Sequence, residues 1–372
     1  MTAREFNKRL AQANSREDKI SLLDSRAEEL FDKQRYREAS KHYLAALKLE
    51  RRQNVRAYFS GQLGICYYNL GNDAEARKYL LKSANLFDPE KPDFMADMYG
   101  FVQFHLGSLY EYKGDVLKSL KARKLCEQYI DSQEKDTRWM LYSGISRNYE
   151  VLGRPNEAIE YSQKAIQVLS NDDPGLAYLY ESMGNNYLSM KQYSDALQYF
   201  SKVLELDPDF ERQDEIYLKV ANCYHNLTND RMALETYRRM LELKEITGKK
   251  QNLTWLYTRI AECYFRVEQH EKSLQAALEA LRRRAKNHLE KAELRSYLTT
   301  NQYELGRYRD AVVEGEKTVK LAKDFRNNNE FFFRMALSYH KLGDRKNFAK
   351  YRKLCRKMFP EDNWNKYLDK LG

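Results

Sequence analysis

Breakers of regular structure are scarce in this chain of 372 residues, which contains only 6 proline and 15 glycine residues. A chain so poor in turn-forming residues does not fit a many-stranded β design or a Pro/Gly-rich protein. Hydrophobic residues make up 42% of the composition, yet no uncharged apolar stretch approaches the roughly 20 residues that a bilayer crossing requires. The composition therefore predicts a soluble, mostly helical protein.

Cysteine is also sparse, and its spacing indicates neither a disulfide framework nor a metal site. The five cysteines are odd in number and widely spread, with no C-x-x-C pair: Cys66, Cys126, Cys223, Cys263 and Cys355. The first ten residues are polar and lack the apolar stretch of a secretory signal. Both observations predict a reducing, cytoplasmic location.

Signatures of catalysis are missing as well. The sequence contains no Walker-type phosphate loop, no Rossmann glycine triplet, no His-Glu-x-x-His and no Gly-x-Ser-x-Gly. Its six histidines lie far apart and lack the spacing of metal ligands. We therefore expect a protein that is not an enzyme and that needs no cofactor or metal.

The sequence does contain a strong internal repeat. One column consists of tyrosines at intervals of 43, 39, 38, 37 and 40 residues: Tyr67, Tyr110, Tyr149, Tyr187, Tyr224 and Tyr264. A small residue follows each of them after nine positions: Ala76, Ser119, Ala158, Ala196, Ala233 and Ser273. Because the distance between the two columns never changes, we expect rigid helical hairpins joined by connections of variable length.

The fullest unit reads Tyr180-x-x-Met183-Gly184-x-x-Tyr187, then Ala196-x-x-x-Phe200 and Pro208. It resembles the tetratricopeptide repeat, with Tyr and Met in place of the usual Trp and Leu. Nine such units can be aligned over residues 20–360, and their long spacing is similar to that of kinesin light chains, spindle-orientation adaptors and the Rap-type regulators of Bacillus. The resemblance implies an all-α, right-handed superhelical solenoid of helix-turn-helix repeats.

The organisation expected for the chain is a single domain, residues 1–372. Residues 1–19 are predicted to form an N-terminal capping helix, in which Thr2 and Glu5 show a capping-box pattern, and Ser15 is placed to cap the first repeat helix. Residues 361–372 are predicted to form a C-terminal capping helix with Trp364 and Leu368 facing inward. Polar end caps of this kind are required by stacked repeats.

Two groups of glycines have different predicted roles. The first group lets helix A of a repeat lie close to helix B: Gly64, Gly107 and Gly184. The second group falls four residues after the tyrosine column or its equivalent, where helix A must end in a left-handed residue: Gly71, Gly114, Gly153, Gly306 and Gly343.

The resemblance also implies a concave groove lined by the A helices. Its candidate polar residues are Arg147, Asn185, Lys219, Asn222, Arg259 and Arg266. Its candidate aromatic residues are Tyr178, Trp255, Phe101 and Phe104, with Tyr58 and Phe333 as further members. Because an Asn amide both donates to and accepts from a peptide backbone, Asn185 and Asn222 flanked by Arg147 and Arg259 predict binding of an extended, partly acidic segment. The alternative is that these polar side chains only solvate a helix face.

Positive charge is concentrated toward the C-terminus. Residues 241–372 contain 29 basic and 18 acidic residues, whereas residues 1–240 contain 35 basic and 36 acidic ones. The candidate basic surface consists of Arg282, Arg283, Arg284, Arg352, Lys353, Arg356 and Lys357. The leading hypothesis is a non-enzymatic adaptor that binds an extended or helical segment of a partner protein in the concave groove. Nucleic-acid binding through the basic third is the alternative, and a peptide-gated regulator is a third reading without residue-level support.

Overall fold

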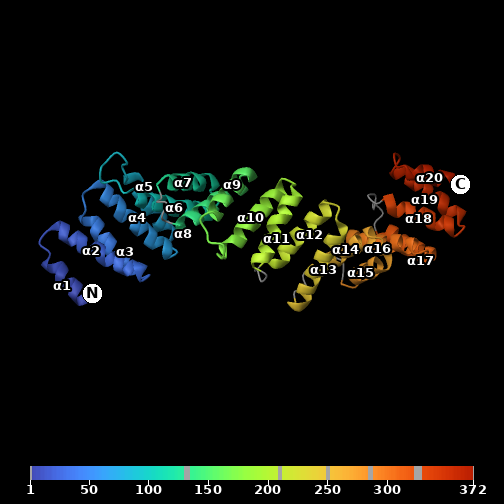
Figure 1. The fold of residues 1–372 in the computed structure, drawn as a ribbon, viewed down its shortest axis with the longest axis horizontal. Coiled ribbons are helices and arrows are strands. Elements are labelled where there is room, and N and C mark those ends of the chain that lie inside the picture. The colour runs from blue at the N-terminus through green and yellow to red at the C-terminus, as the bar shows by residue number, and fades with distance from the viewer. Residues whose placement is uncertain are drawn as a thin grey trace. The chain divides into compact units, whose positions relative to one another are not determined.

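The computed structural model describes residues 2–129, 135–207, 212–248, 252–283, 288–321 and 329–371, and over these ranges it contains twenty helices and no strand (Figure 1). The chain divides into two compact units, residues 1–191 and 192–372. The first contains α1 Ala3–Gln12, α2 Arg16–Asp32, α3 Tyr36–Leu49, α4 Gln53–Asn69, α5 Asp73–Leu86, α6 Ala96–Tyr112, α7 Val116–Tyr129, α8 Lys135–Val151, α9 Pro155–Ile166 and α10 Gly175–Ser189. The second contains α11 Tyr193–Leu206, α12 Gln213–Asn226, α13 Asp230–Ile246, α14 Leu253–Arg266, α15 His270–Arg282, α16 His288–Glu304, α17 Tyr308–Leu321, α18 Asn329–Lys341, α19 Arg345–Met358 and α20 Trp364–Lys370.

Helices α2 to α19 alternate between the A and B helices of successive repeats. In the first unit α2 packs on α3, α4 on α5, α6 on α7 and α8 on α9, and in the second unit α12 packs on α13, α14 on α15, α16 on α17 and α18 on α19. The fifth repeat supplies α10 to the first unit and α11 to the second. This order confirms the predicted all-α fold of nine repeats between capping helices. Whether the whole chain behaves as one domain stays a prediction.

Each A helix ends in a left-handed residue, as the repeat register predicts. The five glycines of the second group have φ angles between 67° and 75°. In the other four repeats the same place holds a residue with a Cβ atom, at φ angles of 57° to 60°: Gln34, Lys191, Thr228 and Glu268. The turn is therefore imposed by the packing of the hairpin even where the sequence lacks the glycine that favours it.

Close approach of helix A to helix B explains the first group of glycines. A Cβ atom on Gly64 would lie 2.6 Å from Cγ of Leu80 and 3.0 Å from its backbone nitrogen. Two repeats have Ser in the small column, and their hydroxyls donate to helix A carbonyls: Ser119 to Gly107 at 2.8 Å and Ser273 to Ala261 at 2.7 Å. Small residues on both helices therefore bring the two backbones together.

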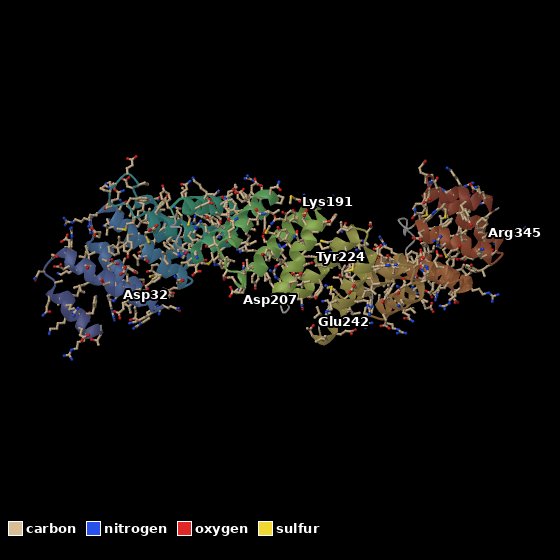
Figure 2. All side chains as sticks on the ribbon, viewed as in Figure 1. Asp32, Lys191, Asp207, Tyr224, Glu242 and Arg345 are labelled. Carbon is tan, nitrogen blue, oxygen red and sulfur yellow. The ribbon has the colours of Figure 1, made fainter. Side chains whose placement is uncertain are left out.

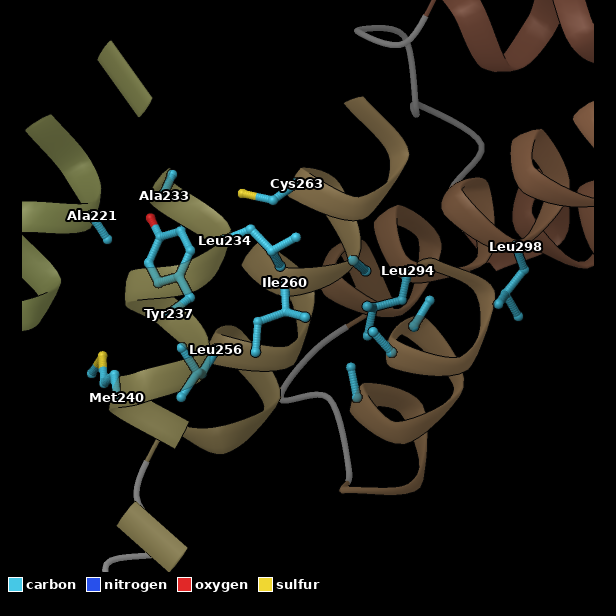
Figure 3. Close-up of a cluster of buried hydrophobic side chains, with 14 residues drawn as sticks. Ala221, Ala233, Leu234, Tyr237, Met240, Leu256, Ile260, Cys263, Leu294 and Leu298 are labelled. Atoms are coloured by element: carbon cyan, nitrogen blue, oxygen red, sulfur yellow. The ribbon is translucent and has the colours of Figure 1, made fainter. Parts of the chain in front are cut away.

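The apolar columns form continuous clusters that run from one repeat to the next. Figure 3 shows one of them, in which Tyr237, Leu256, Ile260 and Leu294 connect α13, α14 and α16. All five cysteines are free and buried, and burial raises the pKa of each thiol, for example that of Cys66 to about 12. The cysteines therefore act as small hydrophobic residues.

The predicted caps are present at both ends. Thr2 and Glu5 form a capping box on α1, and Ser15 caps α2. The C-terminal helix α20 begins at Trp364, slightly later than predicted; Leu368 is fully buried, and Trp364 stacks on Phe333 with ring centroids 4.6 Å apart. Within the described ranges, no helix combines the length and apolar character that a membrane span needs.

Candidate functional site

A polar surface runs along the A helices of each unit. In the first unit α4, α6, α8 and α10 contact one another in order, and in the second unit α14, α16 and α18 do so. Polar contacts join neighbouring A helices: Tyr58 with Asp24, Arg147 with Glu111, Asn186 with Glu150, Arg259 with Glu293, and Arg334 with Glu304. We call this surface the A-helix face, because it corresponds to the predicted groove lining.

Arg147 of the first unit is held by a carboxylate that also reaches the core. Its Nη1 lies 2.9 Å from Oε1 of Glu111, whose Oε2 lies 2.5 Å from Nη2 of Arg123. Arg123 is 4% exposed and occupies the place where other repeats carry Leu80 or Phe200. The two guanidinium groups lower the pKa of Glu111 against the opposing effect of burial. The exposed groove candidate Arg147 is thus paired with a carboxylate that is itself held by the buried Arg123.

Asp24 and Glu28 form a carboxylate pair near the start of the A-helix face. The Tyr58 hydroxyl on α4 donates to both, at 3.3 Å to Oδ1 of Asp24 and 3.2 Å to Oε1 of Glu28. Burial, together with the charge of Glu28, raises the pKa of Asp24 to about 6, although the Tyr58 hydrogen bond opposes the shift. The folded protein therefore holds the proton of Asp24 more tightly than the unfolded chain does.

The raised pKa of Asp24 predicts that the free energy of unfolding depends on pH. The pKa of Asp24 in the folded protein lies above the unfolded value of about 3.9. Protonation of Asp24 therefore stabilises the fold: its contribution to the free energy of unfolding is complete below about pH 4 and is lost as the pH rises through about 6. Asp24→Asn keeps an acceptor for Tyr58 and should raise the free energy of unfolding at pH 7 by about 1 kcal/mol after solvent screening. Urea unfolding at several pH values measures this. Asp32→Asn, an exposed site on the same helix, serves as the control, and equal gains for both variants would contradict the assignment.

The second unit brings three of the predicted groove residues onto one helix. Trp255, Arg259, Glu262 and Arg266 follow one another along α14 and form what we call the α14 stripe. Arg259 lies over the Trp255 ring at 5.9 Å and pairs with Oε2 of Glu262 at 2.5 Å. Arg266 pairs with Oε1 of the same Glu262 at 2.9 Å. Both guanidinium groups are therefore fixed in place by one carboxylate.

Further carboxylates lie around the α14 stripe. Glu293 lies 3.6 Å from Arg259, and Asp230 lies 3.9 Å from Arg266. Arg266 and Asp230 also line a polar cleft of about 480 Å³, together with Thr228 and other turn residues. The buried Oδ1 atom of Asp230 accepts no hydrogen bond from the described part of the chain. Two cations thus face three carboxylates, and the stripe has no excess of positive charge.

The other polar groove candidates are distributed over both units. Asn185 is half-buried on α10 in the first unit, and Asn222 and Lys219 are half-buried on α12 in the second. Oδ1 of Asn222 accepts a hydrogen bond from the buried Tyr237 at 3.2 Å. Asn222 therefore contributes to the scaffold, and its replacement would cost stability as well as any peptide contact.

The aromatic groove candidates differ in exposure. Tyr178 is 51% exposed, and Phe101 is half-buried. Phe104 is half-buried and packs against the core cluster around Leu141. Phe333 is buried beneath Trp364 and offers no groove surface.

The candidate basic surface divides into two groups. Arg282 and Arg283 at the end of α15 both pair with Glu279, and Arg284 lies outside the described residues. On α19, Arg352 lies over the Phe348 ring, Lys353 and Lys357 are exposed, and Arg356 pairs with Asp369 at 2.5 Å. Arg282 and Arg283 on α15 thus share one carboxylate and keep a net charge of about +1, whereas the α19 group remains more strongly cationic.

Sequence reasoning placed Glu262 on the groove lining beside Arg147, Asn185 and Asn222, but it did not pair the groove cations with the carboxylates that hold them. Glu111 immediately follows the tyrosine column, and Glu262 occupies the same repeat place as Asn185 and Asn222. These two glutamates could have been paired with arginines only by placing the A helices of successive repeats side by side and comparing the residues that face one another. Among the described residues, no group of three or more His, Cys, Asp and Glu residues could hold a metal ion.

Comparisons with known proteins agree with this architecture. Models of the tetratricopeptide repeat family match residues 62–87 and 136–209. The anaphase-promoting complex subunit CDC16 of Saccharomyces cerevisiae is 24% identical over 213 residues, which are 56% of this chain and 23% of that protein. The chain thus matches less than a quarter of that relative's length.

Two solved structures share the fold. The C-terminal part of a repeat-containing protein of Cytophaga hutchinsonii aligns with a TM-score of 0.53 and 21% identity, over 73% of this chain and 98% of the other. The apo form of RapI aligns with a TM-score of 0.50 and 12% identity, over 92% and 98%. With the hairpins and the repeat register, these matches show that the chain has the fold of a tetratricopeptide-repeat solenoid, and models of that repeat match two of its segments.

Proposed function

We propose that this protein is a non-enzymatic adaptor that binds an extended segment of a partner protein along the α14 stripe. The observation that carries the proposal is the fixed row of Trp255, Arg259, Glu262 and Arg266 on a single helix. The side chains of Arg266 and Arg259 are 43% and 30% exposed, so part of each guanidinium group remains open to solvent, although Nε of Arg259 is buried. Their positions are set before a ligand arrives, which lowers the entropic cost of binding.

The chemistry of the stripe suits a peptide backbone. The guanidinium groups of Arg259 and Arg266 can donate to peptide carbonyls. The half-buried Trp255 offers an aromatic surface for an apolar side chain. Because three carboxylates face the two arginines, we propose recognition through backbone and apolar contacts rather than through acidic side chains of the partner.

A random-peptide display library selected on the full-length protein tests this function. Arg259→Lys with Arg266→Lys keeps the charges beside Glu262 but removes the planar donor fork. We expect the selected peptides to bind this variant at least about tenfold more weakly, which corresponds to the loss of one or two charge-assisted hydrogen bonds. The melting temperature should change little.

The matched control is Arg238→Lys with Arg239→Lys on α13, where both side chains are exposed. It should bind the selected peptides as the unchanged protein does. Equal affinity of the α14 variant and this control would contradict the proposed site.

A further inference from the structure

Helix α19 differs from the other B helices in its charge. It contains seven basic residues, Arg345, Lys346, Lys350, Arg352, Lys353, Arg356 and Lys357, and no acidic residue. Each of the other B helices, from α3 to α17, contains at least one carboxylate. Phe348, Tyr351 and Cys355 are buried on its opposite side. Figure 2 shows Arg345, at the start of α19, at the outer edge of the second unit.

Four of these cations form a row along the helix, which we call the lysine stripe: Lys346, Lys350, Lys353 and Lys357. All four are exposed. At about 100° per residue they fall within about 60° of the helix circumference, and at 1.5 Å per residue they span about 16 Å. Within the described ranges, no carboxylate lies within ion-pair distance of Lys346, Lys353 or Lys357, and the nearby Asp344 at the start of α19 acts on the charge of Lys346 only through space.

The basic surface is narrow, because carboxylates of other helices lie at both of its edges. Nζ of Lys350 lies 3.8 Å from Glu316 of α17, and Arg356 pairs with Asp369 of α20. These two cations are about 120° apart on the helix. A broad anionic plane such as a membrane surface would also meet the carboxylates, whereas a linear polyanion can follow the row between them.

The type of cation indicates phosphate rather than carboxylate. Arginine binds carboxylates through its planar fork, but Arg352 lies over Phe348 and Arg356 is already paired. Apart from Arg345, the cations of α19 without a carboxylate or ring contact in the described part of the chain are lysines, which act as point charges and suit phosphate oxygens. A nucleic-acid strand carries one phosphate per about 3.4 Å of helix axis, so several phosphates face a row of this length.

We propose that the lysine stripe of α19 binds the phosphate backbone of nucleic acid without sequence preference. The only uncharged exposed side chain on α19 is that of Ala349, so this face offers no aromatic ring for base stacking. Recognition is therefore electrostatic and independent of the α14 stripe, and it depends on salt.

Fluorescence anisotropy of the full-length protein with a labelled mixed-sequence duplex tests this site. The logarithm of affinity should fall with the logarithm of salt concentration, with a slope of about −3 to −4, between about 50 and 200 mM salt. Replacing Lys346, Lys350, Lys353 and Lys357 with Gln should weaken binding at least about tenfold at the lower salt concentration and bring the slope close to zero.

The matched control also replaces four exposed lysines with Gln, but in the first unit: Lys41, Lys82, Lys113 and Lys121. Its affinity should stay within about twofold of the unchanged protein, because the charges removed lie away from the stripe. No binding of the duplex at low salt, or equal loss in the two variants, would overturn the proposal. So would stripe-dependent binding only to anionic vesicles or to polyglutamate.

Discussion

Glu111→Ala should destabilise the first unit by about 3 kcal/mol, because it leaves the buried Arg123 guanidinium without its counter-ion. Arg123 is 4% exposed, and Glu111 is the carboxylate that pairs with it, at 2.5 Å. The remaining partners of Arg123 Nη1 are neutral: the hydroxyl of Ser119, the carbonyl of Gly144 and the amide oxygen of Asn148. Neutral acceptors do not offset the cost of burying a full charge.

Arg123→Met should cost less, about 1 to 2 kcal/mol, because it removes the buried charge itself. Glu111 then keeps its ion pair with Arg147, and a methionine can fill the space beside Gly107 and Gly144. The double variant should be no less stable than Glu111→Ala alone, since the charge that Glu111 balances is absent.

Urea unfolding followed by the fluorescence of Trp139 on α8 measures these differences, in a background where Trp255 and Trp364 are replaced with Phe. The order of the two single variants is the decisive result. A larger loss for Arg123→Met than for Glu111→Ala would mean that packing, and not charge balance, dominates this site.

Phe331→Ala should destabilise the second unit by about 3 to 5 kcal/mol through the cavity that it creates. Phe331 on α18 is fully buried, and its ring lies edge-on to Phe332 at 5.0 Å. It belongs to a cluster with Met335, Tyr351 and Leu368, which connects α18, α19 and the capping helix α20. Loss of this ring should therefore loosen the cap together with the last repeat.

The fluorescence of Trp364, measured with Trp139 and Trp255 replaced by Phe, should report the Phe331 effect as a lower urea midpoint. Tyr367→Ala is a suitable control, because Tyr367 also belongs to α20 but is 53% exposed. Its replacement should change the free energy of unfolding by less than about 1 kcal/mol. Similar midpoints for Phe331→Ala and the control would show that this cluster does not hold the cap.

Much of the fold could be predicted because its rules are local. The interval of nine residues between Tyr67 and Ala76 recurs in every unit that carries the two columns, and it sets the geometry of each hairpin. The left-handed turns follow from the same register. The register also identifies Thr228 as the left-handed residue of its repeat, and this residue adopts a φ of 58° although it is not glycine.

Parts of the site were less predictable. Trp255, Arg259 and Arg266 lie on one helix, as the repeat places implied. Their sequence does not reveal that Glu262 holds both arginines, and the predicted acidic partner rested on cations that this carboxylate partly neutralises. Similarly, Arg123 stands in a column that is apolar in other repeats, which marks it as unusual. The repeat motif does not show which residues it contacts.

The sequence by itself determined the repeat, its hairpins, its turns and its buried columns, because these depend on spacings within a single unit. The tertiary structure decided which charges remain available. Contacts such as Arg147 with Glu111 join residues 36 positions apart on neighbouring helices. No local spacing rule constrains such pairs, and they form only when the stacking of repeats and the rotamers of long side chains bring the charges together.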